Sequence, residues 1–186
     1  MVRGMVLDPS AARDDDIAST GPGLGEVSGK RIGFRVDRIW RSWDWISADW
    51  ADRLRAAGAD VTFWRSTDRS GAEGERAAKE LGEWLATLDG AIVGLANCGS
   101  CTGWTIRDSL VAAATGIPTI AIATKNFEAF AHEIAARGGR SGLRVHALPY
   151  PLNEREQDEV LAVADEHYRP MLDAIGATQA LQVAAQ

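Results

Sequence analysis

The chain has 186 residues, 46% of them apolar, and a net charge of −6, which is typical of a single-domain globular protein. The acidic balance argues against a nucleic-acid surface, which normally carries a basic stripe. No apolar run reaches the roughly 20 residues of a membrane span, and Asp14-Asp15-Asp16 stands where a secretory signal would be apolar. We therefore expect a cytoplasmic protein.

Secondary structure is predicted to alternate regularly along most of the chain. Residues 1–29 are rich in Gly, Pro, Ser and Asp without a clear period, and they predict an extended or mobile arm. Residues 30–176 are expected to form the folded domain, and 177–186 a loose tail. Apolar periodicity and glycine stops predict strands at 31–36, 60–64, 89–95, 117–123 and 143–148, and helices at 45–57, 72–87, 104–114, 127–136 and 154–175.

The predicted strands at 89–95 and 117–123 are apolar along their whole length, which is typical of parallel strands buried on both faces. Strand–helix alternation of this kind predicts a single three-layer α/β domain. Its sheet is expected to be doubly wound and mostly parallel, of flavodoxin-like or Rossmann-like type. Sites in such folds form at the carboxyl ends of the strands, near a topological switch point.

The two cysteines of the chain, Cys98 and Cys101, stand between a predicted strand and a predicted helix. A thiol at a helix N-terminus feels the positive end of the helix dipole, which favours the reactive thiolate. Gly99 leaves the approach to Cys98 open, while Ser100 and Thr102 supply hydroxyl groups. We include these three residues among the substrate-binding candidates. We expect Cys98 to be the attacking sulfur and Cys101 to resolve its adduct by forming a disulfide.

Other interpretations of this segment stay open. The thiols could be two buried apolar groups, or half of a zinc site whose other ligands come from scattered histidines or a second chain. Gly99, Ser100 and backbone N–H groups could instead cradle a phosphate, although the lysine of a nucleotide loop is missing. We expect no resident cofactor or metal, and an external thiol or thioredoxin-type protein as reductant.

Residues that follow the other strands are candidate substrate contacts. Arg38 follows the first strand, Thr124 and Lys125 follow the fourth, and Tyr150 follows the fifth. Arg38 or Lys125 could bind a carboxylate or hold Cys98 as a thiolate. Trp104 opens the helix after the thiols and is expected to lie beside them. The same residue types also suit solvated loops and helix caps.

Four of the seven tryptophans lie within residues 40–50, directly after the first strand. This segment could wall the pocket, form a subunit interface or pack in the core. We include Trp43 among the substrate-binding candidates. An interface here would make the protein an oligomer, or a non-catalytic interaction subunit.

The stretch Cys98-Gly99-Ser100-Cys101-Thr102, with Thr115-Gly116-Ile117-Pro118 after the next helix, resembles the UGSC proteins. Many of those proteins carry selenocysteine where Cys98 stands here. The segments 6–9, 29–33, 124–127 and 149–152 extend the resemblance over most of the chain. Residues 93–123 also resemble the selenoprotein substrate-binding subunit of glycine, sarcosine and betaine reductases, although Gly103-Trp104 replaces a further cysteine of that motif.

The resemblance implies that the residue at position 98 is a nucleophile. In the reductases the selenolate displaces an activated amine and carries the carbon fragment as a selenoether. The sequence therefore predicts a thiol-dependent enzyme or enzyme subunit that acts on a small molecule, with reductase-like or C–S bond chemistry. Non-catalytic interaction and a metal site shared between chains are the alternatives.

Overall fold

The computed structural model describes residues 13–66 and 69–178. Strands and helices alternate as the sequence predicts. The elements are β1 (Gly25–Glu26), β2 (Arg31–Val36), α1 (Arg41–Ala56), β3 (Asp60–Arg65), α2 (Gly71–Leu85), β4 (Gly90–Ala96), α3 (Gly99–Ala114), β5 (Thr119–Thr124), α4 (Lys125–Arg137), β6 (Arg144–Leu148), α5 (Gln157–Ile175) and β7 (Ala177–Thr178). Residues 1–12 of the predicted arm, which include the 6–9 segment, and 179–186 of the predicted tail lie outside the described residues.

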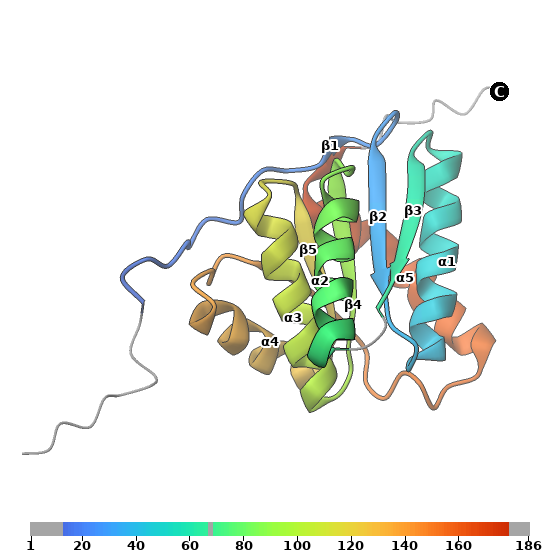
Figure 1. The fold of residues 1–186 in the computed structure, drawn as a ribbon. Coiled ribbons are helices and arrows are strands. Elements are labelled where there is room, and N and C mark those ends of the chain that lie inside the picture. Colours follow the sequence, from blue (N-terminus) through green and yellow to red (C-terminus); the bar gives the residue numbers. More distant parts are fainter. Residues whose placement is uncertain (1–12, 67–68, 179–186) are drawn as a thin grey trace, which may run out of the picture.

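Five parallel strands form the main sheet, in the order β3-β2-β4-β5-β6. Numbered by their own order along the chain, these strands run 2-1-3-4-5, which is the flavodoxin-like doubly wound arrangement. Helices α1 and α5 cover one face, and α2, α3 and α4 cover the other (Figure 1). The predicted three-layer α/β fold is confirmed.

The two faces of the sheet carry side chains of different size. Branched and aromatic residues, Ile32, Phe34, Ile92, Ile120 and Ile122 among them, pack toward α1 and α5. Burying each such side chain stabilises the fold by about 1.5–3 kcal/mol. The opposite face is built largely from alanines, including Ala91, Ala121 and Ala123. These small residues leave room for α3 to lie close to the sheet.

Helix α1 begins at Arg41, earlier than the predicted residue 45, and Trp43 of its first turn lies in the core. Trp43 and Trp50 are fully buried, with their rings 5.9 Å apart in an edge-to-face arrangement. The indole N–H of Trp43 donates to the Arg35 carbonyl at 3.3 Å, and that of Trp50 donates to the Ala164 carbonyl at 2.8 Å. Both indoles therefore satisfy their single donor while burying a large apolar surface.

The described part of the N-terminal segment lies against the domain. Strand β1 pairs in parallel with β7, with Gly25 opposite Ala177, so two segments far apart in the sequence lie side by side. Leu24 and Val27 on either side of β1 are buried. Among residues 13–66 and 69–178, no helix has both the length and the apolar character needed to cross a bilayer.

Candidate functional site

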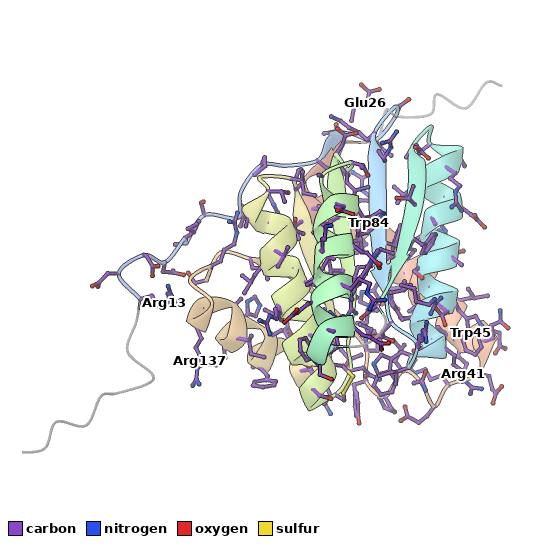
Figure 2. The ribbon with its side chains drawn as sticks, viewed as in Figure 1. Arg13, Glu26, Arg41, Trp45, Trp84 and Arg137 are labelled. Atoms are coloured by element: carbon purple, nitrogen blue, oxygen red, sulfur yellow. A yellow bond between two sulfur atoms is a disulfide. The ribbon has the colours of Figure 1, made fainter. Side chains whose placement is uncertain are left out.

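Cys98 and Cys101 form a disulfide at the carboxyl end of β4, with their Cα atoms 5.2 Å apart. The bond is drawn in yellow in Figure 2, near the start of α3. Cys98 is the N-cap of α3, and its backbone is extended. Cys101 lies in the first turn of the helix. Because the side chain of an N-cap residue turns back over the third residue of the helix, this spacing brings the two sulfurs together.

The two sulfurs have unequal surroundings. Cys98 is partly exposed, whereas Cys101 is 7% exposed. The Cys101 backbone N–H donates to Cys98 Sγ at 3.1 Å, and Ser100 Oγ lies 3.5 Å from the same sulfur. After reduction these groups and the helix dipole would all favour a thiolate at Cys98. The sulfur cap also explains why α3 begins at residue 99 rather than at the predicted residue 104.

Two threonines of the candidate set hold the β4–α3 turn. Thr102 Oγ1 donates to the Cys98 carbonyl at 2.6 Å, and Thr124 Oγ1 donates to Asn97 Oδ1 at 2.9 Å. Both threonines are fully buried. Their hydroxyl groups are thus engaged with the turn, so these residues position the thiols rather than lining an open pocket.

A cavity of about 220 Å³ lies beside the disulfide. Its wall comes from the end of β2 and the segment after it, the segment after β3, and the first turns of α3. Since α1 follows β2 on one face of the sheet and α3 follows β4 on the other, the cavity lies at the topological switch point. Of the two cysteines, Cys101 contributes to the wall. The lining residues are Arg35, Asp37, Arg38, Ile39, Ser66, Arg69, Ser100, Cys101 and Trp104.

A buried ion network forms the floor of this region. Arg35 of β2 and Asp108 of α3 are 2% and 4% exposed. Arg35 Nε donates to Asp108 Oδ2 at 2.8 Å, and its Nη1 donates to the Gly94 carbonyl at 2.8 Å. Burial lowers the pKa of Arg35, and the charge of Asp108 opposes that shift. A guanidinium nonetheless stays protonated in proteins, so the network carries fixed charges.

Arg69 shares the same carboxylate. Its Nη1 and Nη2 donate to the two oxygens of Asp108 at 3.0 and 2.7 Å, a bidentate pair. Its guanidinium also lies 5.1 Å from the centre of the Trp104 ring, and Arg107 lies 5.6 Å from that ring. Two cations therefore contact the ring of Trp104 at the edge of the cavity.

Among the residues predicted from the sequence, Arg38, Ser100, Cys101 and Trp104 line this cavity. Gly99 is exposed beside Cys98, and a Cβ there would meet open space.

Other candidates lie elsewhere. Lys125 is exposed on α4, 4.0 Å from Glu128, and the exposed ring of Tyr150 contacts Phe127. Trp43 does not reach the cavity either, because its ring fills the core beneath Gly94.

The three residues of the ion network, Arg35, Arg69 and Asp108, are absent from the sequence prediction, and two of them had a visible signal. Arg35 is a charge inside an otherwise apolar strand, and Asp108 is a carboxylate in a helix of small and apolar residues. A charge in such a position demands a partner. Arg69 has no comparable signal because it lies in a loop. Among the described residues, no group of three or more His, Cys, Asp or Glu is arranged to hold a metal.

A histidine pair lies away from the cavity, between β6 and α5. His146 Nε2 and His167 Nδ1 are 3.0 Å apart. Burial, with smaller contributions from His167 and Lys125, lowers the pKa of His146 to about 4. Burial also lowers the pKa of His167. Both rings are therefore neutral at pH 7.

A family model described as the UGSC family matches residues 5–177. No curated protein matches the sequence significantly. Among solved structures, a flavo di-iron protein mutant from Thermotoga maritima is 10% identical with a TM-score of 0.46, covering 77% of this chain and 37% of that one. A diflavin flavoprotein from Nostoc sp. is 12% identical with a TM-score of 0.47, covering 78% and 93%. The chain thus spans little more than a third of the first of these structures.

Proposed function

The chain belongs to the UGSC family, and from this membership and the disulfide at the β4–α3 turn we propose that it is a thiol-dependent reductase of a small molecule. The observation that carries the proposal is the pairing of a partly exposed, N-capping Cys98 with a buried Cys101 next to a cavity. Cys98 is the nucleophile, and Cys101 resolves its adduct.

The reaction consumes the dithiol form of the protein. The Cys98 thiolate attacks an electrophilic carbon of the substrate, a C–S bond forms, and the leaving group departs with its electron pair. The Cys101 thiolate then attacks Cys98 Sγ, which forms the disulfide and expels the substrate fragment with the electrons of the broken C–S bond. That fragment takes up a proton. The substrate is thus reduced by two electrons while the dithiol is oxidised.

The surroundings of each sulfur support this division of roles. Cys98 is the more exposed thiol and receives the Cys101 N–H at 3.1 Å, so its thiolate is stabilised where a substrate can approach. Cys101 lies one helical turn further on, within disulfide distance. An external dithiol, such as a thioredoxin-type protein, regenerates the pair by exchange at the exposed sulfur of Cys98.

The test is alkylation of the reduced protein with iodoacetamide at pH 7, followed by intact mass. We expect the wild type and Cys101→Ser to be labelled at Cys98 much faster than free dithiothreitol at equal total thiol concentration, because more of Cys98 is present as thiolate at pH 7. Cys98→Ser should lose that fast phase and leave the slow labelling of a buried thiol. Cys101→Ser is the matched control, since both variants keep one thiol of the pair. Equal labelling rates in the two variants would show that Cys98 is not the activated nucleophile.

A further inference from the structure

Resting on the proposed function, we propose that the substrate is a short-chain carboxylate and that Arg38 binds its carboxylate at the mouth of the cavity. The wall of this cavity carries three guanidinium groups, those of Arg35, Arg38 and Arg69. One carboxylate, that of Asp37, lines the same wall. The carboxylate of Asp108 lies directly behind Arg35 and Arg69. Three positive charges therefore face two negative ones.

Both carboxylates are already engaged with the protein. Asp108 accepts from Arg35 and from both terminal nitrogens of Arg69. Asp37 Oδ1 accepts the backbone N–H groups of Ile39 and Trp40 at 2.9 and 3.3 Å. The other oxygen of Asp37 lies 3.6 Å from Arg35 Nη1. The excess positive charge of the cavity is thus not balanced by either of these carboxylates.

Of the three guanidinium groups, that of Arg38 has no carboxylate partner among the described residues. Its side chain is exposed, and it makes no hydrogen bond or ion pair with any residue in 13–66 or 69–178. Arg35 and Arg69, in contrast, spend their donors on Asp108 and on the Gly94 carbonyl. A planar guanidinium with free donors matches the geometry of a carboxylate, which it binds through two parallel hydrogen bonds.

The size of the cavity limits the rest of the ligand. Sites for drug-sized molecules have volumes of about 300–1,000 Å³, and this cavity has about 220 Å³. Ile39 and the ring of Trp104 supply apolar wall, while Ser100 and Cys101 lie at the sulfur end. A ligand of a few carbons fits this description, with its carboxylate at Arg38 and its reacting carbon toward the thiols.

Two alkylating agents of nearly equal shape test this inference. Iodoacetate carries a carboxylate, and iodoacetamide carries a neutral amide in its place. With either reagent the thiolate forms a C–S bond and iodide leaves. The measured quantity is the ratio of the two second-order rate constants for the reduced protein at pH 7, divided by the same ratio for dithiothreitol.

We expect this ratio to fall about tenfold in Arg38→Gln, which corresponds to the loss of one charge-assisted contact. Arg41→Gln is the matched control. Arg41 is exposed on the first turn of α1, lies over Trp45 rather than in the cavity wall, and its loss changes the net charge equally. Its ratio should stay within about twofold of the wild type. Equal ratios in wild type and Arg38→Gln, or an equal fall in both variants, would overturn the inference.

A second measurement separates this inference from the proposed function. Acetate, propionate and butyrate are titrated into a Cys98→Ser/Cys101→Ser variant, and the arginine Nε–H signals are followed by NMR. A saturable shift of the Arg38 signal, lost in Arg38→Gln, supports carboxylate binding even if Cys98 labelling proves slow. Fast labelling of Cys98 without any such shift would support the reductase proposal and would overturn the inference that the substrate is a carboxylate bound by Arg38.

Discussion

Replacing Asp108 by Asn tests the ion network beneath the cavity. The change keeps the shape of the side chain and removes its charge. It also turns one acceptor into an N–H₂ donor that faces the guanidinium donors of Arg35 and Arg69. Arg35 cannot escape to water, because it is 2% exposed and enclosed between the sheet and α3. The variant therefore leaves a buried cation without its main partner.

The magnitude follows from the burial of the two cations. Breaking a buried ion pair by removing one partner costs about 3–5 kcal/mol. The side chain of Arg69 is 20% exposed and can turn toward solvent, and Asp37 lies 3.6 Å from Arg35. Both features relieve part of the cost. We therefore expect the lower end of that range, a loss of about 3 kcal/mol in the free energy of unfolding.

Urea-induced unfolding, followed by tryptophan fluorescence and by circular dichroism, measures this loss. Asp165→Asn is the matched control, because Asp165 pairs with Arg53 at 2.7 Å with a side chain that is 73% exposed. An exposed pair of this kind contributes no more than about 1 kcal/mol. If Asp108→Asn costs no more than Asp165→Asn, then Asp37 and water carry the charge of Arg35, and the argument fails.

Two further predictions concern stability. The lowered pKa of His146 means that the unfolded chain binds more protons below pH 6.5, so the free energy of unfolding should fall by about 1–2 kcal/mol from pH 7 to pH 5. Urea titrations at both pH values should show most of this slope removed in His146→Gln and kept in the exposed-site control His132→Gln; parallel slopes in all three proteins would contradict it. Gly94→Ala would place a Cβ 2.5 Å from the buried Trp43 ring and should cost about 1–3 kcal/mol. Gly82→Ala meets open space in α2 and should instead add about 0.5–1 kcal/mol; thermal unfolding that ranks these two variants the other way would refute the packing argument.

The order of strands and helices was predictable because each element carries its own periodicity. The boundaries of these elements were harder to predict, and α3 shows the reason. Its N-cap is a sulfur, Cys98, which is outside the usual set of capping residues. The predicted helix therefore begins at residue 104, although the helix itself begins at Gly99. Helix α1 was likewise predicted to begin too late, so Trp43 fell outside the predicted helix. The spacing of Trp43 from Ile46 and Trp50 is nevertheless that of a core-facing stripe on a helix.

The candidate site also has one part that the sequence predicts and another part that it does not. Cys98 and Cys101 are neighbours along the chain, so their proximity can be predicted without knowing the fold. The ion network at the cavity is different, since Arg35, Arg69 and Asp108 come from β2, a loop and α3. Local periodicity gives no register between these elements. Their meeting depends on strand order and on the close approach of α3 to an alanine-lined sheet, both of which are tertiary properties.

The short β1–β7 ladder gives the molecule a mechanical property. Because β1 and β7 run parallel, tension applied between the N-terminal and C-terminal segments pulls the two strands past each other in shear. Bonds such as Gly25 N–H to the Gly176 carbonyl at 2.9 Å and Leu24 N–H to the Ile175 carbonyl at 3.1 Å then bear the load together rather than opening one by one. The ladder lies at the opposite end of the sheet from the disulfide (Figures 1 and 2). A force on the chain ends is thus taken up before it reaches the thiols.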